Sequence, residues 1–296
     1  MMLQHFGLRE APFGLTPDTS FAFASRSHRE AHDTVMVALE GGDGFIKITG
    51  EVGTGKTLLC RRLLASLDGR YKTLFLPNPC IHRRSLLISL GLELGLSFEM
   101  NTPQAQLLPL ITNALLDNAQ EGRTTVVCLD EAQAMSDGAL EALRLLTNIE
   151  TEKNRLLRVV MFGQPELDLK LARPHMRQLA QRIAFHYELE ALTRDETLDY
   201  LNHRMRAAGH SGATVFGARE ARVLHAITGG TPRLLNVVAH KALLLAYGCG
   251  ETVVRLQHIH AAADDTPAAQ ARGLVAGLAT QWSRMTSPLN LRWGAS

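Results

Sequence analysis

Gly50-Glu51-Val52-Gly53-Thr54-Gly55-Lys56-Thr57 follows the pattern G-x-x-x-x-G-K-[ST] of a phosphate-binding loop. Residues 45–49, directly before it, are apolar and β-branched. Residues 58–65, directly after it, have the apolar spacing of a helix. A strand, a glycine-rich loop and a helix in this order are the context in which the pattern binds phosphate. The chain is therefore predicted to bind a nucleoside triphosphate.

The residue types of this loop match that chemistry. Glycines let successive backbone N–H groups converge on phosphate oxygens, and the N-terminus of the following helix adds its positive end. Lys56 is expected to reach the β- and γ-phosphates, and the Thr57 hydroxyl to bind Mg²⁺. The predicted nucleotide contacts are Gly50, Glu51, Val52, Gly53, Thr54, Gly55, Lys56, Thr57 and Leu58.

A pair of carboxylates follows another apolar run, Val126-Val127-Cys128-Leu129-Asp130-Glu131. We expect Asp130 to hold Mg²⁺ through its water shell and Glu131 to orient the attacking water. Paired acids after a strand can also cap a helix, but a phosphate loop upstream favours the catalytic interpretation. An Asp-Glu pair predicts hydrolysis of the nucleotide rather than binding alone.

Further polar residues lie where charge on the γ-phosphate needs a partner. Gln164 follows an apolar run and can bond the γ-phosphate or the water; the alternative is a plain turn residue. Arg182 can act as an arginine finger from a neighbouring subunit, with Arg177 as the competing candidate and a surface salt bridge as the alternative. Arg233, at the start of a helix after Gly229-Gly230, can report the nucleotide state, unless it is simply exposed to solvent.

Alternating strands and helices predict an α/β fold with a five-stranded parallel sheet covered on both faces. After residue 192 only helical patterns follow, which places a domain boundary near residue 191. We predict a nucleotide-binding core over residues 1–190 that includes an N-terminal arm, a helical lid over 191–265 and a tail over 266–296. The predicted strands span residues 45–49, 72–76, 124–129, 156–162 and 183–189.

Bulk composition is that of an ordinary globular protein of 296 residues, with 46% hydrophobic and 20% charged residues. A net charge of +2 gives no global electrostatic case for nucleic acid. The four cysteines have no metal-like spacing, which is typical of thiols in a reducing compartment. The N-terminus has no signal-peptide pattern, and the chain has no apolar run long enough to span a membrane. A cytoplasmic location is therefore expected.

Four segments together resemble the AAA+ ATPases, and among them the secretion ATPases of the ExeA/GspA type: residues 6–18, 44–57, 162–167 and 229–233. The resemblance covers roughly residues 1–265, and the arm Phe-Gly-Leu…Pro-Phe…Thr-Pro-Asp makes it specific. It implies Walker A at 50–57, Walker B at 126–131, sensor 1 at Gln164 and sensor 2 at Arg233. It also implies an αβα core followed by a small helical lid, with ATP and Mg²⁺ at their junction.

Within that group the chain resembles the branch that serves biogenesis of the mannose-sensitive haemagglutinin (MSHA, type IV) pilus. The resemblance implies pilus or secretion assembly proteins at the bacterial inner membrane as partners. The chain lacks the transmembrane and peptidoglycan-binding regions of ExeA, so direct anchoring to the cell wall is not expected. Because Arg182 can act only on a neighbour's nucleotide, we also expect a homo-oligomeric ring or filament favoured by ATP.

Two other functions remain open from the sequence. One is a DNA-associated AAA+ regulator similar to the transposition ATPases, against which the near-neutral charge counts. The other is a nucleotide-gated scaffold that hydrolyses little ATP, against which Glu131 counts. Histidines such as His258 and His260, two apart on a predicted helix, point to different faces and do not suggest a metal site. The tail is interpreted as a helix that docks on its own domain or contacts a partner or membrane surface.

Overall fold

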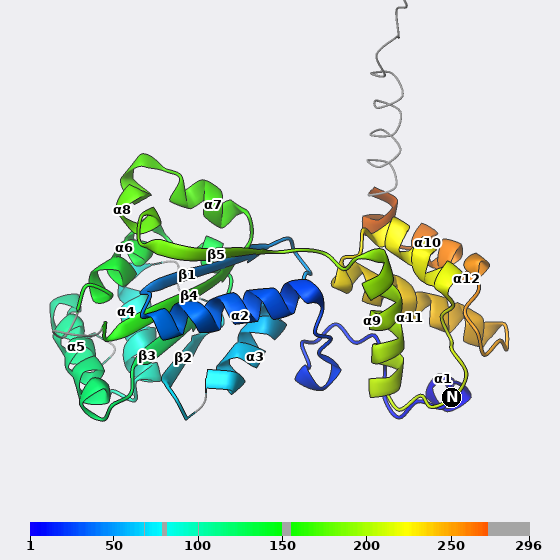
Figure 1. Cartoon of the computed structure of the whole chain (residues 1–296), viewed down its shortest axis with the longest axis horizontal. Helices are drawn as coiled ribbons and strands as arrows, with labels where there is room; N and C mark the ends of the chain where they lie inside the picture. Colours follow the sequence, from blue (N-terminus) through cyan, green and yellow to red (C-terminus); the bar gives the residue numbers. More distant parts are fainter. Residues whose placement is uncertain (68, 79–81, 100, 150–154, 272–296) are drawn as a thin grey trace, which may run out of the picture. The chain divides into compact units, whose positions relative to one another are not determined.

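The computed structural model describes residues 1–67, 69–78, 82–99, 101–149 and 155–271. It divides into two compact units, whose elements Figure 1 labels. The core unit comprises Pro17–Glu190. The helical unit combines Met1–Thr16 with the chain from Ala191 onward. The sequence prediction grouped residues 1–16 with the core, whereas their contacts group them with the helices.

A five-stranded parallel sheet forms the centre of the core unit, in the order β2-β3-β4-β1-β5. This confirms the predicted α/β fold. Strands β3 and β4 consist almost entirely of buried apolar residues, as expected for central parallel strands covered on both faces. The strands are β1 (Phe45–Gly50), β2 (Lys72–Leu76), β3 (Thr125–Leu129), β4 (Leu157–Gly163) and β5 (Ile183–Leu189).

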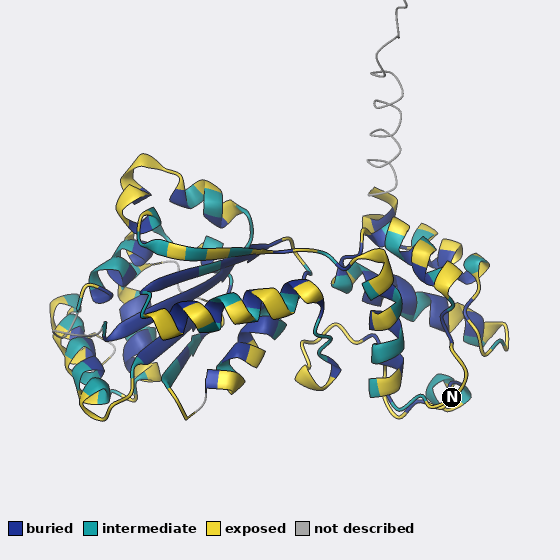
Figure 2. Ribbon diagram, viewed as in Figure 1, coloured by how far each residue is buried: buried dark blue, intermediate teal, exposed yellow. Residues whose placement is uncertain are grey.

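Helices cover both faces of this sheet, because alternate strand residues feed two separate hydrophobic clusters. Val126 and Cys128 pack with α2 and α3 on one face, while Val127 and Leu129 pack with α4, α5, α6 and α7 on the other. Figure 2 shows the central strands dark blue, which marks buried residues, and the edge strand β5 mostly teal and yellow. The helices are α2 (Arg26–Gly41), α3 (Lys56–Leu67), α4 (Arg83–Glu93), α5 (Gln104–Gln120), α6 (Asp137–Leu146), α7 (Glu166–Leu171) and α8 (Arg177–Ala180), with 3₁₀ turns η1 (Thr19–Phe21), η2 (Ala132–Ala134) and η3 (Pro174–Met176).

The parallel arrangement brings the candidate site together. The loops that follow β1, β3 and β4 all leave the carboxyl edge of the sheet, where ligands of open α/β sheets bind. Register pairs Leu129 with Met161 and Thr49 with Gly163, so the three strand ends are adjacent. The phosphate loop, the Asp130–Glu131 pair and Gln164 therefore meet at one edge.

The helical unit packs its helices with the N-terminal arm. Phe6, Leu8 and Phe13 of the arm are buried, and the Phe13 ring lies edge-on to that of Phe216, with ring centroids 5.6 Å apart. Arg204 donates from Nε to Pro12 O at 2.5 Å, which fixes the arm against this unit. The elements are α1 (Met2–His5), α9 (Arg194–Ala207), α10 (Ala218–Thr228), α11 (Pro232–Gly248) and α12 (Leu256–Asp264).

Among the described residues, none of the helices combines the length and the apolar character that a membrane crossing requires. The predicted amphipathic helix of the tail falls on residues 272–296, which lie outside the described residues.

Candidate nucleotide site

The phosphate loop has the backbone that its sequence predicts. Gly53 and Gly55 adopt φ of 84° and 99°, in the left-handed region that favours glycine. Gly50 is constrained differently, since a methyl group there would lie 2.9 Å from Leu189 Cβ on β5. Helix α3 starts at Lys56, so its unpaired N–H groups point toward the loop. These features form an anion-binding cradle.

Lys56 is nearly enclosed within that cradle. Its ammonium donates to Gly50 O at 2.6 Å and to Glu51 O at 2.9 Å, and the residue is only 5% exposed. Burial lowers the pKa of Lys56 below its ordinary value, although the nearby Glu131 and Asp130 carboxylates raise it. A cation held over the loop under this desolvation is ready to bind an anionic phosphate.

The side-chain oxygens of Thr57 and Asp130 lie next to each other. The Thr57 hydroxyl donates to Asp130 Oδ2 at 2.6 Å, across the first turn of α3 and the end of β3. Burial raises the pKa of Asp130, while the hydrogen bond from Thr57 lowers it. A hydroxyl and a carboxylate are hard oxygen donors of the kind Mg²⁺ prefers. The residues therefore fit Mg²⁺ bound with a polyphosphate. The cation would balance the carboxylate of Asp130, and the phosphate would balance the ammonium of Lys56.

Glu131 follows Asp130 in an unusual backbone conformation. Among the described residues, Glu131 is the one non-glycine residue in the left-handed region, with a φ of 56°. Such a conformation costs about 1–3 kcal/mol and is found where function fixes a side chain. Glu131 Oε2 accepts hydrogen bonds from Gln164 Nε2 at 3.1 Å and from Gln133 Nε2 at 2.5 Å. The structure thus brings predicted Gln164 directly to the predicted catalytic carboxylate.

Gln133 is a site residue that the sequence interpretation missed. Its amide oxygen accepts from Gln164 N at 3.0 Å, so one side chain links the loops after β3 and β4. Its backbone carbonyl accepts from Lys170 Nζ of α7 at 2.5 Å. Gly163 makes room for it, since a methyl group there would lie 3.3 Å from Gln133 Oε1 and 2.8 Å from Leu167 Cδ2. The only signal in the sequence was a polar residue two positions after Glu131.

Arg182 and Arg177 lie elsewhere. Arg182 immediately precedes β5, whose first residue pairs with Phe45 at the start of β1. It therefore sits at the amino edge of the sheet, about 20 Å along the strands from the phosphate loop. A hydrogen bond from Arg144, and more weakly the charge of Arg182, lower the pKa of Glu141 in α6. Arg177, in α8, is exposed. Neither arginine belongs to the cluster around Lys56 in its own chain.

Arg233 is exposed in the first turn of α11, in the helical unit. Pro232 occupies the start of that helix, after Gly229 and Gly230 with φ of 60° and 70°. Leu192 N donates to Gly230 O at 3.0 Å. A methyl group on Gly230 would lie only 2.0 Å from Leu192 O. The turn before Arg233 is therefore bound to the first residues of the helical unit after the core.

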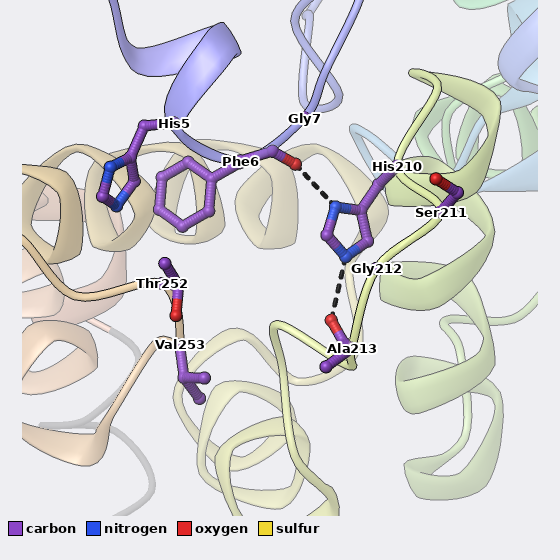
Figure 3. A pocket seen from close by; sticks show the side chains of 9 residues that line it. All are labelled: His5, Phe6, Gly7, His210, Ser211, Gly212, Ala213, Thr252 and Val253. Atoms are coloured by element: carbon purple, nitrogen blue, oxygen red, sulfur yellow. Dashed lines mark hydrogen bonds between the residues drawn. The ribbon is translucent and has the colours of Figure 1, made fainter.

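A cavity of about 360 Å³ lies where the arm meets the loops after α9 and α11 (Figure 3). At its side His210 spans two segments, with Nδ1 2.6 Å from Phe6 O and Nε2 2.8 Å from Ala213 O. His210 thus fixes the arm to the α9–α10 loop.

Comparison with known proteins places these features in context. Residues 39–171 match the family model of the AAA domain. The chain is 40% identical over 250 residues to General secretion pathway protein A of Aeromonas hydrophila. The match covers 84% of this chain but 46% of that protein, so the chain spans about half the length of this curated relative.

Solved structures give the same fold at low sequence identity. The Aeropyrum pernix ORC2 protein in its ADPNP–ADP complexes matches with a TM-score of 0.64 at 19% identity, covering 84% of this chain and 72% of that one. Cdc6p of Pyrobaculum aerophilum matches with a TM-score of 0.64 at 15% identity, covering 84% and 70%. The RuvB Holliday junction branch migration motor of Thermotoga maritima matches with a TM-score of 0.53 at 13% identity, covering 80% and 68%. The chain has the AAA+ P-loop NTPase fold.

Proposed function

We propose that this chain is a Mg²⁺-dependent ATPase of the ExeA/GspA type. The observation that carries the proposal is the convergence of Lys56, Thr57, Asp130 and Glu131 from two strand ends onto one cradle. The AAA domain match and the similarity to a general secretion pathway protein support the same conclusion.

In this proposal each side chain has one role. Lys56 leaves its two carbonyl acceptors and binds the β- and γ-phosphates, while Thr57 and Asp130 hold Mg²⁺, directly and through water. Bound Mg²⁺ neutralises the charge that develops on the phosphate oxygens. Glu131 orients the attacking water, and Gln164 turns one amide hydrogen toward the γ-phosphate or that water.

The residues of the loop bind the phosphates through their backbones. Gly53, Gly55 and Lys56 would offer N–H groups, and Val52 and Leu58 would contact the nucleotide beside them. Arg233 would report the state of the γ-phosphate to the helical unit, which then acts as the lid. Hydrolysis would change the position of that lid and so transmit work to a partner.

Binding can be tested separately from hydrolysis. Titration of a fluorescent ATP analogue with Mg²⁺ should saturate at one site per chain in the wild type. Lys56→Ala should weaken binding by roughly 10- to 100-fold, because a desolvated charge-assisted contact is lost. An exposed cationic control, Arg222→Ala on α10, should leave the affinity unchanged. Equal affinities for wild type and Lys56→Ala would contradict the proposed site.

We further propose that the partners are secretion or pilus assembly proteins at the bacterial inner membrane, and that the MSHA-type pilus is the system served. The support is the similarity to General secretion pathway protein A and the resemblance of residues 6–18 and 229–233 to that group. The protein would act from the cytoplasmic side, through its partners.

We propose assembly into a homo-oligomer on the basis of the position of Arg182. This arginine lies at the far end of the sheet from the phosphate loop of its own chain, so it can stabilise transition-state charge only on a neighbour's nucleotide. A ring or filament favoured by ATP would provide that arrangement, and Arg177 of α8 is the alternative finger.

A further inference from the structure

The first turn of α2 contacts both the phosphate loop and the last residue of the core unit. Its N-cap, Ser25, is 2% exposed and accepts from His28 N at 3.2 Å. The same Ser25 Oγ lies 2.6 Å from Nδ1 of the His28 ring. One buried hydroxyl therefore fixes both the start of the helix and the orientation of this imidazole.

The opposite edge of that ring lies against the phosphate loop. A methyl group on Gly55 would sit 2.8 Å from His28 Nε2 and 3.4 Å from Cε1. The ring thus occupies the space that a side chain would take at the residue directly before Lys56. A shift of the loop backbone at Gly55 must displace His28 or be resisted by it, because packed groups this close cannot overlap.

The neighbouring residues of the same turn hold the end of β5. Ser27, which is 7% exposed, accepts from Glu190 N at 3.0 Å. One turn further on, Glu30 accepts from the Tyr187 hydroxyl at 2.7 Å. Glu190 is the last residue of the core unit. Two residues later, Leu192 N is bound to Gly230 O within the helical unit.

The chain passes between the units twice, at Thr16–Pro17 and again at Glu190–Ala191. The second passage has an anchored amide on each side of Ala191. Glu190 is bound to the turn of α2 that contacts the phosphate loop. Leu192 is bound to the glycine turn that precedes Arg233. Of the residues around this passage, Ala191 is the one whose backbone can absorb a change of direction while both anchors stay intact.

We propose that the Ser25–His28 turn couples the phosphate loop to this hinge, with His28 as a positioning residue. The inference rests on the proposed nucleotide binding at Lys56. Phosphate binding must release Lys56 from Gly50 O and Glu51 O, which reorganises the loop next to Gly55. His28 passes that change to α2, and Ser27 passes it to Glu190 and so to the hinge.

Hydrogen exchange over residues 186–193 tests this coupling, with the intact chain and a saturating, non-hydrolysable ATP analogue with Mg²⁺. In the wild type, bound nucleotide should slow exchange in this segment by roughly threefold or more, because the hinge anchors are strengthened. Ser27→Ala should bind nucleotide with an affinity within about twofold of wild type. It should nevertheless lose the nucleotide-dependent slowing.

His28 variants separate positioning from folding. His28→Ala should lose the slowing and bind nucleotide roughly three- to tenfold more weakly. His28→Gln, whose amide reaches the position of Nε2, should restore part of both effects. His32→Ala is the matched control, since His32 lies one turn along α2 and contacts Ser66 of α3 at 3.1 Å instead; it should behave as wild type.

Slowing of exchange in saturated Ser27→Ala and His28→Ala to the wild-type extent would overturn the coupling. So would nucleotide-bound wild type whose 186–193 segment exchanges as in the free protein. Failure of the proposed function looks different, because the binding titration of the wild type would then show no saturable nucleotide site at all.

Discussion

Glu131 combines a left-handed backbone with a carboxylate held by two amides. Gln133 and Gln164 both donate to the same oxygen, Oε2, so the carboxylate has one defined direction. Lys170 fixes the carbonyl of Gln133 from α7. A carboxylate held this way orients a water more reliably than a freely rotating side chain does.

Removing Gln133 should therefore reduce turnover more than nucleotide binding. In Gln133→Ala we expect kcat to fall about tenfold, the effect of one charge-assisted hydrogen bond of about 1.4 kcal/mol, with KM for ATP within about twofold. Steady-state hydrolysis measures both quantities. Gln178→Ala, an exposed glutamine of α8, is the matched control. A Gln133→Ala variant with the kcat of wild type would show that Gln164 alone orients Glu131.

At single residues the sequence predicted the site wherever the motif is local. Lys56 and Thr57 lie together as expected, because loop residues of a strand–loop–helix unit are placed by short-range geometry. Asp130 meets Thr57 from 73 residues away, because both follow parallel strands that end at one edge of the sheet. Gln133 and His28 could not be predicted in this way. Gln133 lies only two residues from Glu131, but it is fixed by Gln164 and Lys170. Those contacts, like that of His28 with Gly55, join segments brought together by sheet order and helix packing. No spacing in one sequence records such contacts.

Among the elements, the glycine turn before α11 makes the strictest steric demand. Gly230 has φ of 70°, and a methyl group there would approach Leu192 O to 2.0 Å. Gly230→Ala should therefore destabilise the helical unit by about 2–4 kcal/mol, measured by denaturant unfolding followed by circular dichroism. Gly248→Ala, at the open end of α11, is the control and should be neutral or slightly stabilising. Equal unfolding midpoints for both variants would contradict this account of the turn.

His225 of α10 should make the helical unit sensitive to acid. Burial, and then the charge of Arg194, lower its pKa, and Nδ1 lies 3.1 Å from Thr197 Oγ1. A histidine whose folded-state pKa is lowered favours folding in its neutral form. Its contribution is thus present above the unfolded value of about 6.5 and is lost as pH falls below it.

Unfolding midpoints between pH 7.5 and pH 5 measure this effect. The midpoint should fall less steeply with acid in His225→Asn than in wild type, because the variant has no proton to take up on unfolding. His240→Asn on α11 provides a comparison for a histidine outside this contact. Identical pH slopes for wild type and His225→Asn would exclude the proposed linkage.

Element types were predictable where periodicity was clear. Strands β2 and β5 match the predicted bounds, because the apolar pattern is clear there. Helix α7 was not predicted. Its leucines alternate at 167, 169 and 171, a period typical of a strand, yet Leu169 is 73% exposed while Leu167 and Leu171 are buried one helical turn apart. Pro165 at the start of the segment and packing against η2 favour a helix over a strand there.

At the level of the whole molecule, the two anchored amides flanking Ala191 and the distant Arg182 are the features on which the proposed coupling between units and between chains rests. The sequence placed the boundary near residue 191 from the change to helical pattern alone. It could not assign residues 1–16, because an irregular arm carries no periodicity and its partners, such as Arg204 and His210, lie about 200 residues away in sequence.

The shared-site proposal predicts a dependence on protein concentration. Turnover per subunit should rise with concentration in the wild type, and Arg182→Ala should lower it by roughly 10³-fold while nucleotide still binds. Arg219→Ala, on an exposed face of α10, should follow the wild-type curve. Turnover per subunit that is flat with concentration and insensitive to Arg182 would mean that each chain completes its own site.

Steady-state release of phosphate from Mg²⁺-ATP, measured for wild type and Glu131→Gln alongside nucleotide affinity, tests the central claim most directly. Glu131 lies beside, not within, the groups proposed to bind phosphate and metal. We therefore expect Glu131→Gln to keep its ATP affinity within about threefold and to lose hydrolysis by at least roughly 10²-fold. Hydrolysis at the wild-type rate in Glu131→Gln, or a wild type that binds ATP and releases no phosphate, would contradict the assignment of this site as an ATPase.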